Sequence, residues 1–532
     1  MTMKKLATFL GISLLATSCG ILDEDPRDQK PESEIVIDAT SLYLTTLGNL
    51  YSQFGSDETG EGLMGTYRGI YDLNTFTTDE AVIPTRGGDW YDGGLWQRLF
   101  LHTWETGEAP LKNSWNYLYK VIVSANQALE TLSANKKLLS GDEYLAWTAE
   151  VRAVRAMYYY YLCDLFGRVP LVTSTSTAMA DVAQSERSEV FAFVKSELEE
   201  AESLLHLGRS NSEGEYYGRI TQPVAWFLLA KLCLNAEVYL DDDWTDGARA
   251  SCPDYYAEAV GWCERLTGVY SLEASYPDNF SVFNENSVEN ILTIPMDMQK
   301  YSAQFQYLFR SLHYDHAAAC GMSGENGASA TLEALEANGF GTTDEDPRFA
   351  MNYWGGQAVD LSGAAITLPT GEPLVYKPLS VALDVTGDAD EKLAGARMRK
   401  YSIDPNGMKD GKLVGNDIVL FRYADVLLMK AEALLRRGEA ADEALYLVNM
   451  VRARAGAATL GSVSLDDILR ERMVEFAWEG WRRQDLVRFG AFTRSWSSRP
   501  ALDGESSGYT TVFPIPADVL ALNPKLTQNP GY

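Results

Sequence analysis

Residues 423–455 read YADVLLMKAEALLRRGEAADEALYLVNMVRARA, and this stretch decides the fold class. Apolar residues recur every three or four positions through 423–437 and again through 440–455, which is the spacing of two amphipathic helices. Gly438 lies between them, at a position where helices commonly end. Alanines alternate with bulky side chains, as they do in helical hairpins whose small residues receive a neighbour's large ones. The stretch therefore predicts a tetratricopeptide-like pair of antiparallel helices.

The same spacing recurs through the N-terminal half of the chain. The match to a strict repeat consensus is loose, so the pattern predicts repeat-like hairpins and not a regular array. The longest segment runs into Gly167 with Pro170 beyond, which is an ordinary helix stop. We expect helices at 40–54, 112–134, 142–166, 188–207, 222–239 and 254–266.

The character of the sequence changes between residues 279 and 419. Gly, Pro, Ser and Asp become frequent and helical periodicity fades, except at 330–337. Short β-like runs appear at 291–294 and 374–376. Long irregular segments in a compact protein are usually functional. The fold class predicted is mainly α, an α-solenoid-like body of helical hairpins with loop-rich, minor-β insertions that form a ligand face.

The N-terminus has the features of a secretory signal. Lys4 and Lys5 precede an apolar run at 6–15, and small residues then lead to Cys19. A cysteine at this point indicates a lipoprotein processing site, with an ordinary cleaved signal as the alternative. We predict that Cys19 is lipidated and that multiple acyl chains anchor it stably. The predicted divisions are 1–18 signal peptide, 19–39 lipidated cysteine and flexible tether, 40–278 N-terminal helical region with ligand loops, and 279–532 C-terminal region.

Composition excludes several classes of partner and cofactor. The net charge of −29 argues against nucleic acid or anionic lipid. The cysteines after Cys19 are scattered with no C-x-x-C pair, so neither a disulfide framework nor a zinc site is predicted. We expect no cofactor and no metal. Two of these cysteines, Cys163 and Cys233, lie in apolar helical runs and are predicted to be core residues.

The stretch 84–96 reads PTRGGDWYDGGLW and is the candidate binding segment. Sugar recognition needs flat aromatic faces for the C–H face of a ring, with carboxylate and guanidinium groups for the hydroxyls. Glycines here flank two tryptophans and a tyrosine, and a Thr-Asp-Glu triplet lies just upstream. The alternative is that the tryptophans are buried and pack a long loop against the helical body. The glycan-binding residues predicted here are Asp79 of the triplet and, in the segment itself, Arg86, Asp89, Trp90, Tyr91 and Trp96.

No catalytic signature accompanies this segment. The chain has no G-x-S-x-G, H-E-x-x-H, G-x-G-x-x-G or phosphate-loop motif. His313 and His316 form an H-x-x-H that we interpret as a polar loop, and the acidic run at 241–247 as a helix–helix turn. A glycosidase needs two carboxylates across the scissile bond, and nothing singles out such a pair. We therefore predict a binding protein with no catalytic residues.

Three motifs follow one another in the C-terminal part of the chain. They are RYADVLLMKAEA at 422–433, LRERMVEFAWEGWRRQDLVRFG at 469–490, and the ending FPIP at 513–516 with QNPGY at 528–532. Together and in this order they resemble the SusD/RagB family of the Bacteroidetes. The resemblance extends nearly end to end and includes the acidic segment after Cys19. The charged residues around Trp478 and Trp481 are interpreted as an ion-pair network that locks helices together.

The resemblance implies a function and a location. Such proteins act as lids on a SusC-like TonB-dependent transporter of the outer membrane and help to deliver oligosaccharides, or peptides in some branches. The protein is accordingly expected at the outer membrane, anchored in its lipid through acylated Cys19 and facing the cell exterior. Its expected partners are that transporter and an oligosaccharide ligand. A peptide-capturing protein and a repeat scaffold that binds no ligand are the alternatives.

The resemblance also adds candidate site residues. In the starch-binding branch an arginine after a Gly-aromatic step and a tryptophan after a Thr-Asp-Glu triplet touch the glycan. Arg68 resembles the first, and Trp90 the second after a short insertion. Aromatics of the middle region, here Tyr301, Tyr307 and Tyr314, also contact glycan in that branch. A later tryptophan of the branch is missing, so a glycan other than starch is as well supported.

Overall fold

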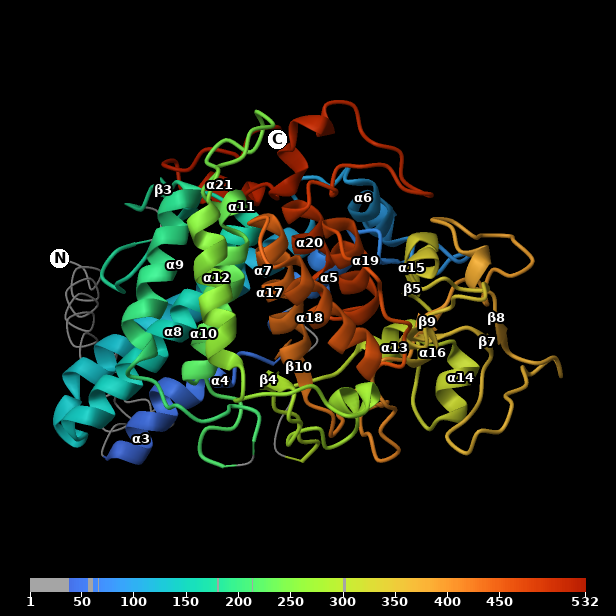
Figure 1. Ribbon diagram of the computed structural model, residues 1–532, viewed down its shortest axis with the longest axis horizontal. Coiled ribbons are helices and arrows are strands. Elements are labelled where there is room, and N and C mark those ends of the chain that lie inside the picture. Colours follow the sequence, from blue (N-terminus) through green and yellow to red (C-terminus); the bar gives the residue numbers. More distant parts are fainter. Residues whose placement is uncertain (1–37, 56–60, 66, 179–180, 213, 300–302) are drawn as a thin grey trace, which may run out of the picture.

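The computed structural model describes residues 38–55, 61–65, 67–178, 181–212, 214–299 and 303–532. Long helices form one side of the molecule, and a loop-rich lobe carrying β7 (Gly356–Gln357), β8 (Val375–Tyr376) and α14 (Tyr314–Ala319) forms the other (Figure 1). The predicted signal peptide and Cys19 lie outside the described residues. Within the described part, no helix combines the length and apolarity needed to cross a membrane.

The body is a row of helices in which each member packs on the next. α7 packs on α8, α8 on α9, α9 on α10, α10 on α12, α12 on α17, and α17 on α18. This arrangement confirms the predicted mainly helical fold with hairpin packing. The helices of the row are α7 (Ala109–Ala134), α8 (Gly141–Phe166), α9 (Arg187–Glu202), α10 (Gln222–Leu234), α12 (Pro253–Leu266), α17 (Tyr423–Arg436) and α18 (Ala441–Arg454).

Local sequence explains where the central helix α8 begins and ends. Ser140 is its N-cap, and it exchanges hydrogen bonds with Glu143 in a capping box that satisfies two free backbone N–H groups. Gly167 ends the helix with a φ of 65°, a conformation that glycine adopts without a Cβ penalty. The C-terminal half of α8, including four consecutive tyrosines at 158–161, is buried. α8 therefore forms the centre of the helical body.

Three predicted helices differ from the observed ones. The segment 40–54 is helical but passes through a π-helical turn, and the helix at 188–207 ends already at Glu202. The segment 222–239 breaks at Asn235, whose ψ of 10° departs from the helical value and whose side-chain amide donates to the Lys231 carbonyl at 2.8 Å. The pieces involved are α3 (Ala39–Tyr43), η1 (Leu44–Gly48), α4 (Asn49–Tyr51) and α11 (Ala236–Tyr239).

Short antiparallel strand pairs attach the middle region to this body. β4 (Asn290–Ile294) pairs with β10 (Ile418–Arg422), and β10 runs directly into α17. β1 (Ala81–Val82) pairs with β5 (Ser329–Ala330), which places the candidate binding segment beside the middle region. The remaining pairs are β2 (Val169–Pro170) with β3 (Gln184–Ser185), β6 (Tyr353–Trp354) with β9 (Arg397–Met398), and β7 with β8.

Short helices complete the fold at the edges of the body and in the lobe. The middle region has the predicted loops and small sheets and a short helix within the predicted segment 330–337, together with further short helices that the sequence did not indicate. The short helices of the whole fold are α5 (Ile70–Thr75), α6 (Leu95–Leu101), α13 (Tyr307–Ser311), α15 (Leu332–Ala337), α16 (Arg348–Asn352), α19 (Leu465–Glu475), α20 (Arg482–Arg488) and α21 (Ala517–Leu522), with 3₁₀ turns η2 (Asp92–Gly94), η3 (Lys136–Leu138), η5 (Tyr276–Phe280), η6 (Pro378–Ser380), η7 (Glu505–Ser507) and η8 (Tyr509–Thr511).

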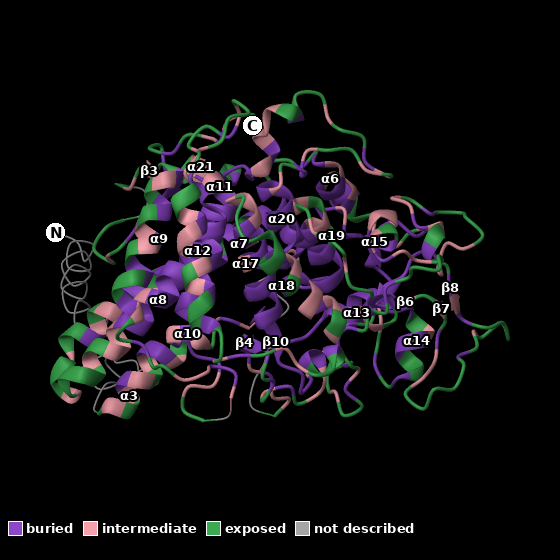
Figure 2. Cartoon of the chain, in the orientation of Figure 1, coloured by how far each residue is buried: buried purple, intermediate pink, exposed green. Residues whose placement is uncertain are grey.

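The centre of the molecule is buried (Figure 2). It contains an ion-pair network. Arg422, the last residue of β10, contacts Glu475 at 2.5 Å, Glu479 at 2.8 Å and Glu289 at 2.9 Å. Arg348 contacts the second carboxylate oxygen of Glu475 at 2.8 Å. These residues come from the middle region, from β10 and from α19 and the turn after it. The prediction that the C-terminal motif locks elements together is confirmed.

A second group of buried ion pairs joins α17 to α19 and α20. Arg472 donates to Asp425 at 2.6 Å, and Arg488 donates to Glu432 at 2.7 Å. Burial raises the pKa of Glu432, but Arg488 and the nearby Arg436 outweigh burial and hold this pKa at about 2. The carboxylate therefore stays charged throughout the physiological range.

Replacing Arg422 by Met is expected to lower the free energy of unfolding by about 3–5 kcal/mol, because the buried carboxylates lose their counter-charge. Urea unfolding followed by circular dichroism measures this change. The matched control is Lys112→Met, because Lys112 forms an exposed pair with Asp518 at 2.6 Å and such pairs contribute about 0–1 kcal/mol. Equal losses for the two variants would contradict a special role for the buried network.

Candidate functional site

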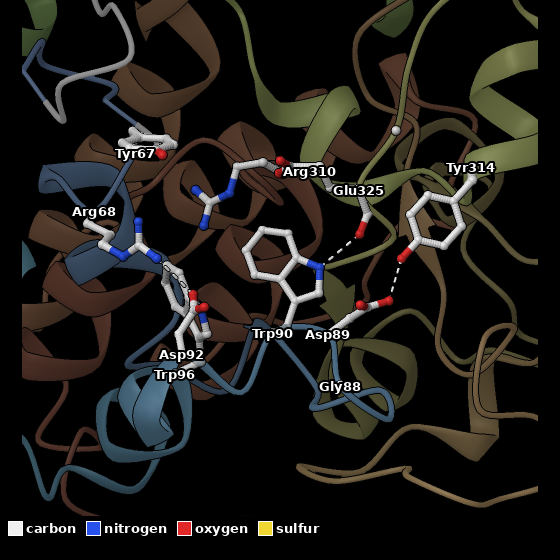
Figure 3. A pocket seen from close by; sticks show the side chains of 11 residues that line it. Tyr67, Arg68, Gly88, Asp89, Trp90, Asp92, Trp96, Arg310, Tyr314 and Glu325 are labelled. Carbon is white, nitrogen blue, oxygen red and sulfur yellow. Dashed lines mark hydrogen bonds and ion pairs between the residues drawn. The ribbon is translucent and has the colours of Figure 1, made fainter.

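A pocket of about 420 Å³ lies where residues 67–96 meet residues 310–325 (Figure 3). Its walls combine aromatic rings with charged side chains and two glycines. The lining residues are Tyr67, Arg68, Gly88, Asp89, Trp90, Asp92, Trp96, Arg310, Tyr314, Gly324 and Glu325. Segments more than two hundred residues apart in the sequence therefore build one site.

Trp90 stands in the middle of the pocket and is fixed on two sides. Its indole N–H donates to the Glu325 carbonyl at 2.8 Å, and its ring meets that of Trp96 edge-on at 5.9 Å between centroids. Gly327 lies against the ring, where a Cβ would come within 2.6 Å of it. Because one edge is bonded and one side is packed, the orientation of the indole is set by the protein itself.

A polar chain of contacts leads from Arg68 to the pocket floor. The Arg68 guanidinium contacts the Asp92 carboxylate at 2.9 Å, and the same oxygen accepts the Trp96 indole N–H at 2.8 Å. Trp96 is only 2% exposed, so it forms the floor of the pocket. Arg68, Trp90 and Asp92 all have positive φ, at 62°, 62° and 44°. Non-glycine residues in this region are strained, and such strain clusters at functional sites.

A buried pair holds the inner wall of the pocket. Arg310 donates to Asp72 at 2.7 Å, and Asp72 also accepts the Arg68 backbone N–H at 2.8 Å. The Arg310 guanidinium carbon lies 5.1 Å from the Trp96 ring centroid and 5.7 Å from that of Trp90, which is cation–π distance. Burial raises the pKa of Asp72 to about 6 although Arg310 opposes this shift.

The outer rim of the pocket is built around Asp89. Its carboxylate accepts the Tyr314 hydroxyl at 2.6 Å and the Lys392 ammonium at 2.9 Å. These two bonds lower the pKa of Asp89, the Tyr314 bond more than the Lys392 bond. The rings of Tyr314 and Tyr67 are exposed at the edge of the pocket. The rim therefore presents aromatic surface next to an ionised carboxylate and a cation.

Five of the predicted site residues meet at this pocket. Arg68, Asp89, Trp90, Trp96 and Tyr314 line it. The predicted Tyr91 is beside it and 55% exposed, but does not line it. The predicted Tyr301 lies outside the described residues.

The structure corrects the predictions for Asp79, Arg86 and Tyr307, which hold the fold together. Arg482 donates two hydrogen bonds to the Asp79 carboxylate, at 2.6 and 2.7 Å. Arg86 is 0% exposed and donates to the carbonyls of residues 391 and 394 and to a serine hydroxyl. Tyr307 is buried, stacks on Tyr71 at 4.5 Å and donates to a backbone carbonyl. None of these side chains lines the pocket.

Four pocket side chains were not predicted as site residues: Tyr67, Asp92, Arg310 and Glu325. Asp92 could have been predicted from the sequence, because it lies four residues before Trp96 in the glycine-rich segment. Tyr67 adjoins the predicted Arg68. Arg310 and Glu325 belong to no motif, and tertiary contacts such as the pairing of β1 with β5 and the Arg310–Asp72 ion pair bring their region to the site.

The two other polar motifs have structural contacts of their own. His313 caps α14 by accepting the Asp315 N–H, and His316 bonds the Tyr376 hydroxyl at 3.0 Å. The run at 241–247 is a turn between α11 and α12. Among the described residues no group of three or more His, Cys, Asp or Glu side chains is placed to hold a metal ion.

Family comparisons identify the class of protein to which this fold and pocket belong. Residues 344–532 match the model of the SusD family, and residues 62–234 match a related model described as "Starch-binding associating with outer membrane". The chain belongs to the SusD family. The matches together cover the ion-pair motif and the first half of the pocket.

One relative is similar in sequence over most of its length, and two solved structures share the fold. The chain is 27% identical to the starch-binding protein SusD of Bacteroides thetaiotaomicron, over 90% of this chain and 87% of that protein. A solved laminarin-binding SusD-like protein superposes with a TM-score of 0.69 and 23% identity, covering 93% of this chain and all of that one. Surface glycan-binding protein A of B. thetaiotaomicron, solved in complex with laminarihexaose, has a TM-score of 0.69 and 19% identity, with coverage of 93% and 100%.

A buried carboxyl links the pocket segment to the C-terminal motif and makes stability depend on pH. Glu80 accepts the Trp478 backbone N–H at 2.5 Å, and burial raises its pKa from 4.5 to about 7. A folded-state pKa above the unfolded one stabilises the protein most at low pH, and this contribution is lost as pH rises from about 4.5 to about 7.

The variant Glu80→Gln keeps an accepting oxygen but carries no charge. Its unfolding free energy relative to the unmodified protein is therefore expected to increase by up to about 3 kcal/mol between pH 4 and pH 8. Urea unfolding across this range measures the difference. A difference that stays constant with pH would show that Glu80 titrates normally.

Proposed function

We propose that the protein captures an oligosaccharide in the pocket around Trp90. The observation that carries the proposal is the indole of Trp90, held between Glu325 and Trp96 on a strained turn, with the Arg68–Asp92 and Lys392–Asp89 pairs on its two sides. An aromatic face takes the C–H side of a sugar ring, and paired ionic groups exchange hydrogen bonds with its hydroxyls.

The relatives support glucans as the first ligands to test. One is named as starch-binding and two solved neighbours are a laminarin-binding protein and a laminarihexaose complex. Starch is an α-glucan and laminarin a β-glucan, so the relatives do not favour one linkage. The proposal is accordingly a glycan-binding protein that takes a short segment of a polysaccharide.

We further propose where the protein works and with which partner. Acylated Cys19 anchors it in the outer membrane with the pocket facing the cell exterior, and a SusC-like TonB-dependent transporter receives the captured sugar. Support comes from the signal and lipidation pattern at residues 4–19, and from the family description of association with the outer membrane.

The chemistry of the pocket favours sugar over the alternatives. A peptide-capturing protein needs a longer apolar cleft, whereas this pocket is lined by Arg, Asp and Glu side chains. A plain scaffold would not need a concave aromatic site. Of the pocket carboxyls, Glu325 has a pKa that burial raises, but Asp89 has a lowered pKa and Asp92 is bonded to Arg68 and Trp96, and the relatives with a printed ligand are named as binding proteins. Binding without cleavage is therefore proposed.

Replacing Trp90 by Ala is expected to weaken oligosaccharide binding at least tenfold, equivalent to about 1.4 kcal/mol, because the stacking face is lost. Isothermal titration calorimetry on residues 20–532 measures the affinity, with α-glucan, β-glucan, fructan, mannan, xylan and pectin oligosaccharides as ligands. The matched control is Tyr91→Ala, which removes an exposed neighbouring ring outside the pocket.

Equal affinities for Trp90→Ala and the unmodified protein would place the binding site elsewhere. No heat with any glycan, from protein that unfolds cooperatively, would contradict glycan capture by the isolated chain. Chromatography of the sugar after incubation separates binding from cleavage, and intact oligosaccharide is the expected result.

A further inference from the structure

A second pocket, of about 220 Å³, lies between the loop 241–250 and the C-terminal segment 490–511. The loop joins α11 to α12 and lies beside the C-terminal segment in Figure 1. This pocket shares no lining residue with the pocket around Trp90. Its properties are therefore independent of the glycan proposal.

Arg187, the first residue of α9, lines this second pocket and is only 1% exposed. Its Nε–H donates to the Cys163 carbonyl at 3.2 Å. Both terminal nitrogens, Nη1 and Nη2, are buried and have no hydrogen-bond partner in the described part of the chain. No carboxylate of that part lies within ion-pair distance of Arg187, whereas the terminal nitrogens of the equally unpaired, buried Arg86 and Arg397 donate to backbone carbonyls. A buried guanidinium whose terminal nitrogens make no hydrogen bond is energetically unfavourable, and a bound acceptor would remove this cost.

Further donors surround the same space. The Trp244 indole N–H is buried without a partner in the described chain, and the Arg187 guanidinium carbon lies 5.8 Å from the Trp244 ring centroid. Arg249 also lines the pocket. Its guanidinium donates to the backbone carbonyls of Val487 at 2.5 Å and Arg488 at 2.7 Å. Ser506 and Ser507 add hydroxyl groups to the lining.

Asp241 is the one carboxylate among the lining residues. It is more than 4 Å from Arg187, and one of its oxygens accepts the Asp243 backbone N–H at 3.1 Å. Burial raises the pKa of Asp241, so its charge is destabilised where it stands. The lining thus carries two guanidinium groups, an open indole donor and four hydroxyls against one carboxylate.

We propose that this pocket is a binding site for a small oxyanion, namely sulfate, phosphate or the carboxylate of an acidic monosaccharide. The anion oxygens accept hydrogen bonds from the two terminal nitrogens of Arg187 and from the Trp244 indole, with Arg249 adding positive charge at the edge. A guanidinium offers a planar pair of donors that matches such groups. The bound anion ties the loop 241–250 to α9 and to the C-terminal segment.

The test is calorimetric titration of residues 20–532 with sodium sulfate, phosphate and galacturonate, with ionic strength held constant by sodium chloride. Galactose serves as the uncharged control. At least one anion is expected to bind saturably, and the three titrations distinguish an inorganic anion from an acidic sugar. Arg187→Met is expected to lower the affinity at least tenfold, and Asp241→Asn to raise it because a competing negative charge is removed.

Arg187 is buried, so its replacement can impair folding, and Trp244→Phe provides a second variant. It keeps a packed ring but removes the indole donor, and a several-fold loss of anion affinity is expected. Saturable binding that neither variant changes would overturn the proposal, because the anion would bind elsewhere. Absence of binding by the unmodified protein would also overturn it, and destabilisation by Asp241→Asn would then identify Asp241 as the counter-ion of Arg187.

Discussion

The contact between Arg422 and Glu475 is the interaction on which the rest of the structure depends. Arg422 ends β10 and precedes α17, so it lies where the strand pair of the middle region meets the helical row. Glu475, at the end of α19, accepts bonds from Arg422, Arg348 and Arg454. Burying such charges is costly, and the mutual pairing offsets the cost only when all partners are in place. Elements distant in sequence are therefore fixed in one arrangement.

The same region of the chain reaches the pocket through two further contacts. Just beyond Glu475, the Trp478 backbone donates to Glu80, and Arg482 clamps Asp79. These acidic residues directly precede β1, whose pairing with β5 brings the glycine-rich turn against the middle region. Strained residues such as Trp90 persist only where the surroundings determine them. A site fixed before the ligand arrives loses less entropy on binding.

Sequence reasoning predicted those elements that local chemistry determines. α17 and α18 follow from apolar spacing and Gly438, and the end of α8 from Gly167. Periodicity did not mark the end of α9, and the break at Asn235 accompanies a contact across the fold, because the Asn235 side-chain oxygen accepts a hydrogen bond from Arg488 at 3.1 Å.

The site shows the same division between local and tertiary information. Trp90 was predictable because glycines present it on a turn. Arg86 was assigned wrongly, because an arginine in a polar segment has the same appearance whether it binds a sugar or, as here, buried backbone carbonyls. Arg310 was missed because its role arises only from the buried pair with Asp72 and the neighbouring tryptophan rings. Tertiary packing therefore determines whether an arginine such as Arg86 or Arg310 belongs to the pocket, and local sequence does not contain this information.

The most direct test of the account is a crystal structure of residues 20–532 with the tightest-binding oligosaccharide of the glycan panel. The account predicts a sugar ring stacked on Trp90, hydroxyls bonded to Asp89 or to the Arg68–Asp92 pair, and a backbone at 78–96 that moves by less than about 1 Å on binding, as in preorganised complexes. A sugar bound away from this pocket, or a loop 78–96 that rearranges to form the site, would contradict the claim that the buried network holds a ready-made glycan site.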